Sequence, residues 1–143
     1  MNKNARFSAA ILLGGAAFAL SNSSILWLLC YAAVFPSCTG SLFHPFVFLI
    51  FGVAGVVLTL VSYGIHTAIQ KVSWYRAWHM LPIFVCVSVL GLRIYSALTA
   101  PEAQISEPLS TIDYVFGLSG LVAGVVVLVF NYSRSNYVFN RTR

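Results

Sequence analysis

Long apolar runs separated by short polar segments are the dominant pattern in this chain. Four such runs cover about residues 7–34, 45–69, 77–99 and 111–130. Each is close to or above the ~20 residues that a helix needs to cross a hydrocarbon core of ~30 Å. The pattern predicts an all-α integral membrane protein. We expect a single membrane domain over residues 1–143, folded as an antiparallel bundle of four transmembrane helices with a basic, aromatic tail at 131–143.

The first run also has the outline of a secretory signal peptide. Lys3 and Arg6 precede an apolar segment, and Ala17-Phe18-Ala19 has the small residues of a cleavage site. Cleavage would leave an apolar segment of only about residues 25–35, roughly half the length that a spanning helix requires. We therefore expect one uncleaved span over the whole first run.

Composition points to lipid as the solvent. The 143 residues are 59% hydrophobic and 8% charged, which leaves too little polar surface to cover a water-soluble globule of this size. The formal net charge of +5 comes from basic residues at the ends of the apolar runs, where they anchor a helix at the membrane surface. We therefore expect the lipid bilayer as a partner and no nucleic acid.

The distribution of charge predicts an orientation. Four crossings place three segments on one side, and these contain Lys3, Arg6, Lys71, Arg76, Arg134, Arg141 and Arg143. The acidic residues fall on the other side: Glu102, Glu107 and Asp113. Because lysine and arginine collect on the cytoplasmic side, we expect both termini and the turn at 70–82 in the cytoplasm. The membrane expected is a bacterial inner membrane or an equivalent bilayer.

Arg93 is a charged residue within the third run, and Asp113 enters the fourth run at a similar depth. A charge at such a depth costs several kcal/mol unless it pairs, lines water or reaches the surface. One interpretation is an ion pair that locks the two helices together, while Asp113 also caps its own helix with Ser110. The alternatives are a contact for an anionic group or partner from outside, and snorkelling to lipid headgroups.

Polar residues near the middles of the four runs predict a polar layer at the membrane midplane: Ser21, Asn22, Ser23, Ser24, Thr59, Ser88 and Ser119. Four consecutive helical residues point around the whole axis, so some of those at 21–24 must face protein or water. Interhelical hydrogen bonds explain the layer most simply. A hydrated substrate path and a break in the first helix are the alternatives.

Glycines predict where helices approach closely. Small residues allow two membrane helices to come into contact, and the candidates are Gly52, Gly55, Gly117, Gly120 and Gly124. The partner could be another helix of this chain or a second subunit.

His66 and His79 lie at matching depth on adjacent antiparallel runs. Two such imidazoles are what a haem b or a metal ion would need, although histidines are also ordinary at a membrane boundary. Cys38 lies in a predicted outer loop, and Cys30 lies near the outer end of the first run. Both a disulfide between them and free thiols are compatible with the sequence.

Absent motifs narrow the function. The sequence has no arrangement of serine, histidine and acid typical of a nucleophilic triad, no phosphate-binding glycine loop and no zinc motif. We therefore expect a non-enzymatic interaction protein without a cofactor. It would be either an accessory subunit of a larger membrane complex or a protective, immunity-type protein that binds another membrane-inserted polypeptide, and it could also bind itself. The alternatives are a small oligomeric transporter or channel that uses the polar layer, and a haem-binding redox subunit.

Overall fold

The computed structural model describes residues 2–32, 45–73, 76–99 and 110–139, except for the side chains of residues 3, 46 and 133–139. In chain order its elements are α1 (Lys3–Tyr31), α2 (Pro45–Ile69), the short 3-10 helix η2 (Ala77–His79), α3 (Met80–Thr99) and α4 (Thr111–Phe139). Four helices are long and apolar enough to cross a membrane. The predicted all-α architecture with four such helices is confirmed.

The helix ends differ from the predicted ones at two places. α1 begins at Lys3 rather than near residue 7, and α4 continues through the predicted tail to Phe139. Residues 131–139 contain neither glycine nor proline, so no residue in this stretch breaks the helix. Pro82 lies in the first turn of α3, where its missing N–H costs no intrahelical hydrogen bond.

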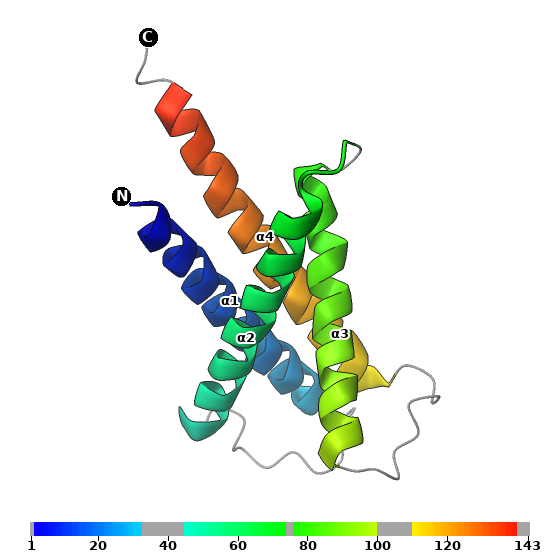
Figure 1. The fold of residues 1–143 in the computed structure, drawn as a ribbon. Coiled ribbons are helices and arrows are strands. Elements are labelled where there is room, and N and C mark those ends of the chain that lie inside the picture. The colour runs from blue at the N-terminus through cyan, green and yellow to red at the C-terminus, as the bar shows by residue number, and fades with distance from the viewer. Residues whose placement is uncertain (1, 33–44, 74–75, 100–109, 140–143) are drawn as a thin grey trace.

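α1 and α4 form the centre of the bundle. They run antiparallel and side by side, whereas α2 crosses α1 and α3 packs on α4 (Figure 1). In the most apolar window of each helix, 44% of the residues of α1 and of α4 are buried, against 17% for α2 and 11% for α3. The described part of the chain therefore leaves most residues of α2 and α3 unburied.

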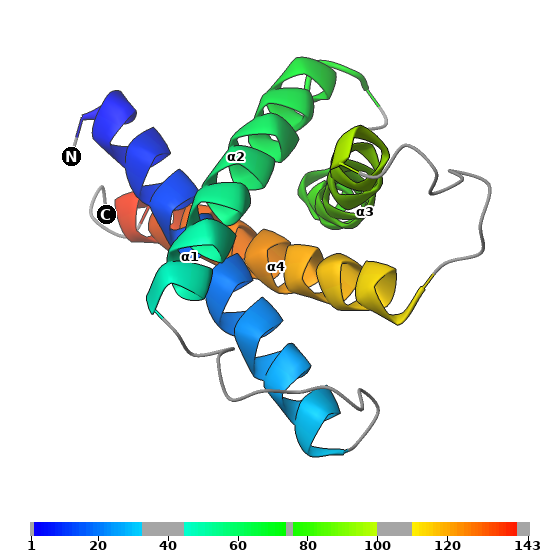
Figure 2. The ribbon, with the colours of Figure 1, turned by 90° about the horizontal axis from the view of Figure 1, so that it is seen from below.

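The helices converge near their middles and splay apart at their ends. Figure 1 shows the N-terminus, the α2–α3 connection and the C-terminal end of α4 at one end of the bundle, which we call the elbow end. The opposite end, which we call the Asp113 end, holds Tyr31, Pro45, Thr99 and Thr111. Seen from below in Figure 2, α3 stands almost end-on while the other three helices diverge.

Glycines permit the close contacts at the middle. A Cβ atom added at Gly55 on α2 would lie 2.8 Å from the Gly15 carbonyl oxygen of α1. A Cβ atom added at Gly120 on α4 would lie 2.8 Å from the Phe84 carbonyl oxygen of α3. Real Cβ atoms do not come that close to an oxygen, so these two crossings depend on small residues. Beside them lies a core cluster that includes Phe18, Phe84, Met80 and Val127.

Candidate functional site

Arg93 and Asp113 form an ion pair between α3 and α4. Arg93 Nη2 lies 2.7 Å from Asp113 Oδ2, and Arg93 Nε donates to Asp113 Oδ1 at 3.2 Å. The two side chains are 19% and 5% exposed. A guanidinium that meets both oxygens of a carboxylate makes a geometrically specific contact. This geometry matches the interpretation in which the pair joins the third and fourth helices.

Asp113 also caps the helix that carries it. Its Oδ2 accepts hydrogen bonds from the Ser110 backbone N–H at 2.7 Å and from Ser110 Oγ at 2.9 Å. The Asp113 N–H donates in return to Ser110 Oγ at 3.4 Å. This reciprocal arrangement satisfies backbone donors at the start of α4. The carboxylate is therefore held by its own helix and by α3 at the same time.

The predicted polar layer is divided into separate sites. Ser119 Oγ lies 3.4 Å from Asn22 Oδ1 and donates to the Val115 carbonyl at 2.8 Å. Ser88 donates to the Phe84 carbonyl of its own helix at 2.7 Å and faces Gly120.

The other members of that layer lie elsewhere. Thr59 is 1% exposed and faces Gly14, whereas Ser21 bonds to the Ala17 carbonyl of its own turn at 2.7 Å. Ser24 is exposed. Among the contacts of the described residues, the one between Asn22 and Ser119 joins two members of the predicted layer.

Three buried polar atoms have no hydrogen-bond partner in the described structure: Asn22 Nδ2, Ser23 Oγ and Ser62 Oγ. Turning the Asn22 amide by 180° would bring its nitrogen to the Ser119 hydroxyl but would leave its oxygen unpaired instead. Either assignment therefore leaves one amide atom without a partner. An unpaired polar group in a protein interior lowers the free energy of unfolding by about 1–3 kcal/mol. The interior of this bundle therefore contains polar atoms whose hydrogen bonds are not all satisfied.

One face of α2 carries buried polar residues, which we call the polar stripe: Thr59, Ser62 and His66. The buried residues in its described part are Gly55, Thr59, Ser62 and His66, which recur every three or four positions and so share one face. The prediction from sequence included Thr59 and His66 separately but missed Ser62 and the stripe. Helical spacing of polar residues within an apolar run was the signal that could have found it.

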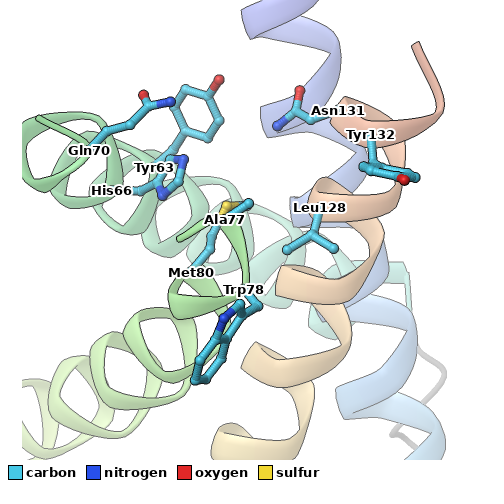
Figure 3. A pocket seen from close by; sticks show the side chains of 9 residues that line it. All are labelled: Tyr63, His66, Gln70, Ala77, Trp78, Met80, Leu128, Asn131 and Tyr132. Atoms are coloured by element: carbon cyan, nitrogen blue, oxygen red, sulfur yellow. The ribbon is translucent and has the colours of Figure 1, made fainter. Parts of the chain in front are cut away.

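A cleft of about 720 Å³ opens at the elbow end between α2, η2 and α4. Figure 3 shows Tyr63, His66 and Gln70 of α2 on one side and Leu128, Asn131 and Tyr132 of α4 on the other. Ala77, Trp78 and Met80 complete the lining. His66 and Met80 are the buried floor at 9% and 2% exposure, whereas Trp78 and Tyr132 at the rim are 58% and 68% exposed.

The second predicted histidine is not part of this lining. His79 Nδ1 accepts a hydrogen bond from the Arg76 backbone N–H at 2.7 Å, and its ring stacks on Trp78 at a centroid distance of 4.2 Å. Among the described residues, no group of three or more His, Cys, Asp or Glu side chains is placed to hold a metal ion. The proposed haem or metal site with His66 and His79 gains no support from this arrangement.

An apolar groove of about 450 Å³ runs along α1 and α2. Its lining contains small or branched apolar residues and one phenylalanine: Leu12, Ala16, Ala19, Phe48, Leu49, Gly52, Val53, Val56 and Val57. Among the described residues, no atom outside the adjacent backbone of α2 lies within 4 Å of the place where a Cβ of residue 52 would stand. The groove therefore has room at Gly52 for a closely packed helix, and no described residue of this chain occupies that room.

The other predicted glycines do meet neighbours within the chain. Gly55, Gly120 and Gly124 face atoms of an adjacent helix at 3.2 Å or less, and Gly117 faces Val89 at 3.4 Å. The prediction missed Gly14, Gly15 and Gly91, which face Thr59, Val56 and Leu58. The Gly14-Gly15 pair inside an apolar run was the available signal.

The cysteines lie apart from the cleft. Cys30 is disulfide-bonded and Cys86 is an exposed free thiol. The predicted partner of Cys30, Cys38, lies outside the described residues.

Comparison with models of known protein families, with curated protein sequences and with solved structures finds no match.

Proposed function

We propose that this protein is a non-enzymatic interaction protein of a membrane, which holds a transmembrane helix of another membrane protein in the groove between α1 and α2. It would serve either as an accessory subunit of a larger membrane complex or as a protective protein against a membrane-inserted polypeptide. The observation that carries the proposal is the open surface at Gly52, which has no neighbour within 4 Å in a groove lined by apolar side chains.

Packing in lipid explains why this surface suits a helix. Lipid tails are as apolar as leucine, so membrane helices associate through close van der Waals contact at small residues. Ala16 and Gly52 offer such a contact on the two sides of the groove. Gly55, one turn further along α2, already makes this kind of contact with α1. A helix of a second copy of this chain would fit by the same chemistry.

Substitution of two matched glycines tests the groove. Gly52 and Gly64 both lie on α2 and both face open space, but only Gly52 lines the groove. We expect Gly52→Leu to abolish copurification of the partner from native membranes. It should also abolish crosslinking of the partner to a photoreactive residue placed at Val53. Gly64→Leu should retain both the copurification and the crosslinking. Equal yields of partner with the two variants, or consistent isolation of the wild-type chain alone, would contradict the proposal.

The proposal includes an orientation, with both termini and the elbow end in the cytoplasm of a bacterial inner membrane. It is supported by the basic residues Lys71 and Arg76, which are exposed at the elbow end. Single cysteines at Ser73 and Ser110, exposed residues at opposite ends, test it in a chain whose native cysteines are replaced. An impermeant maleimide added outside should label Ser110→Cys and spare Ser73→Cys. The reverse pattern would overturn the orientation.

A small transporter or channel is the second candidate, favoured by the polar stripe of α2. Thr59, Ser62 and His66 are buried on one face, and His66 is also the floor of the elbow cleft. The stripe thus leads from the cleft toward the middle of the bundle, where Asn22 has an unpaired amide atom. Ser62→Ala should abolish flux of a transported solute into proteoliposomes, whereas Thr67→Val, on the exposed face of α2, should not. Flux that survives Ser62→Ala would exclude this route.

A further inference from the structure

We propose that the cleft at the elbow end binds an uncharged, planar, lipid-soluble ring with carbonyl groups on opposite edges, which is the chemistry of a quinone headgroup. The assignment is one of binding and includes no redox step. It goes beyond the interaction function proposed above and uses a different surface, because the cleft and the α1–α2 groove share no lining residue.

The charge of the lining argues for a neutral ligand. None of the described residues that line the cleft is an aspartate, glutamate, lysine or arginine. Lys71 and Arg76 are neighbours in sequence of the lining residues Gln70 and Ala77, but they are exposed and do not line the cleft. An anionic headgroup inside it would thus lack the fixed positive partner that such groups require.

The rings of the lining argue for a planar ligand. Tyr63, His66, Trp78 and Tyr132 line the cleft on the sides formed by α2, η2 and α4 (Figure 3). Aromatic rings pack on one another in stacked or edge-to-face geometry. The volume of about 720 Å³ falls in the range of ~300–1,000 Å³ that small-molecule sites occupy, which leaves room for a six-membered ring with the first part of an isoprenoid tail.

The polar groups argue for carbonyls on two edges. Gln70 of α2 and Asn131 of α4 lie on opposite sides of the cleft (Figure 3), and each amide can donate two hydrogen bonds. A 1,4-quinone has one acceptor on each of two opposite edges. Leu128 and Met80 add apolar surface to the lining. Such a set of a few polar groups in a mostly apolar lining is how proteins orient a neutral ligand.

The position of the cleft suits a ligand that is dissolved in lipid. Trp78 and Tyr132 at the rim are amphipathic rings of the kind that sit at the boundary between hydrocarbon and headgroups. A quinone ring in the cleft would lie at that depth.

Binding of a short-tailed 1,4-benzoquinone to the full chain in lipid nanodiscs tests the inference. Equilibrium dialysis against the quinone, corrected with protein-free nanodiscs, gives the saturable fraction. We expect one quinone per chain. Gln70→Leu and Asn131→Leu should each weaken binding about tenfold, because each removes a hydrogen bond from an otherwise apolar site. Leu128→Trp should abolish binding by filling the cleft. Asn4→Leu, at an exposed amide on α1, is the matched control and should bind as the wild type does.

Three results would overturn the inference: no saturable binding by the wild-type chain, binding that Leu128→Trp leaves intact, or displacement of the quinone by an anionic phospholipid at equal concentration. Circular dichroism and gel-filtration profiles show whether each variant is folded. Asn131→Leu and Gln70→Leu keep the inference testable if Leu128→Trp does not fold. The Gly52→Leu variant should bind quinone normally, so failure of this inference and failure of the proposed function are distinguishable.

Discussion

At the Asp113 end, α3 and α4 are joined by the Arg93–Asp113 pair, whose shortest contact is 2.7 Å. At the elbow end, the same two helices diverge, and a cleft of about 720 Å³ opens between α4 and the η2–α3 segment. Between the two ends, Gly120 and Gly124 of α4 lie against Phe84 in the second turn of α3. α4 thus contacts α3 from Asp113 to Gly124, and its later residues Leu128, Asn131 and Tyr132 line the cleft.

The difference follows from the residues that face each other. In the proposed lipid setting, apolar side chains gain little by leaving lipid for one another, so helices stay together where polar pairs or small residues hold them. Arg93, Asp113 and the glycines supply both kinds of contact between α3 and α4, from Asp113 to Gly124 of α4. Beyond Gly124, the lining of the cleft includes Trp78 of η2 and Tyr132 of α4, which are large and mostly exposed.

The largest expected effect comes from breaking the ion pair. Asp113→Ala should lower the free energy of unfolding by about 2–4 kcal/mol, because it strands a partly buried guanidinium and removes the cap of α4. Reversible unfolding in mixed micelles measures the change. Lys71→Ala, an exposed charge at the elbow end, is the control and should stay within about 0.5 kcal/mol. An equal decrease in the free energy of unfolding for the two variants would show that the Arg93–Asp113 pair does not stabilise the fold.

Closing the glycine contact at the middle should have the next largest effect. Gly120→Ala should destabilise the fold by about 1–3 kcal/mol, because the added methyl group meets the Phe84 carbonyl and Ser88 of α3. Gly64→Ala places the same group where no atom lies within 4 Å and should cost nothing measurable. The same unfolding assay compares the two. An unchanged midpoint for Gly120→Ala would mean that α3 and α4 do not cross this closely.

Removing the partly paired amide of Asn22 should change the free energy of unfolding by a smaller amount and in the opposite direction. Asn22→Leu should be neutral or stabilise the fold by up to about 1 kcal/mol, because Ser119 keeps its bond to the Val115 carbonyl and an unpaired buried atom is removed. Ser119→Ala serves as the comparison at the other side of the contact. A loss above about 2 kcal/mol with Asn22→Leu would instead reveal a strong partner for the amide.

Enlarging a side chain at the cleft should have the smallest effect. Leu128→Phe extends into open space and should change stability by less than about 0.5 kcal/mol. The adjacent Val127 is 0% exposed, so Val127→Phe should cost about 1–3 kcal/mol by overpacking. Thermal unfolding of the pair in the same detergent measures the contrast. Equal costs would mean that the face of α4 that lines the cleft is packed as tightly as the face that carries Val127.

Much of the fold could be predicted because the forces that form single helices are local. Twenty apolar residues in a row require internal hydrogen bonding in lipid whatever their neighbours are, so the four helices follow from the hydropathy pattern. Arg93 and Asp113 also carried a local signal, since opposite charges at matching depth on adjacent runs have few other partners. Extension of α4 to Phe139 was missed because aromatic and basic residues at 131–139 were interpreted as a tail rather than as continued helix.

By itself, the sequence determined that the chain forms four long apolar helices, where charges interrupt them and which residues are small enough for close packing. Only the tertiary structure decided that Gly55 meets α1 while Gly52 faces an open groove, that Ser62 is buried while Ser24 is exposed, and that His66 lines a cleft without His79. The physical reason is that helix formation depends on hydrogen bonds within one segment. The rotation and crossing of each helix depend on contacts with all its neighbours at once.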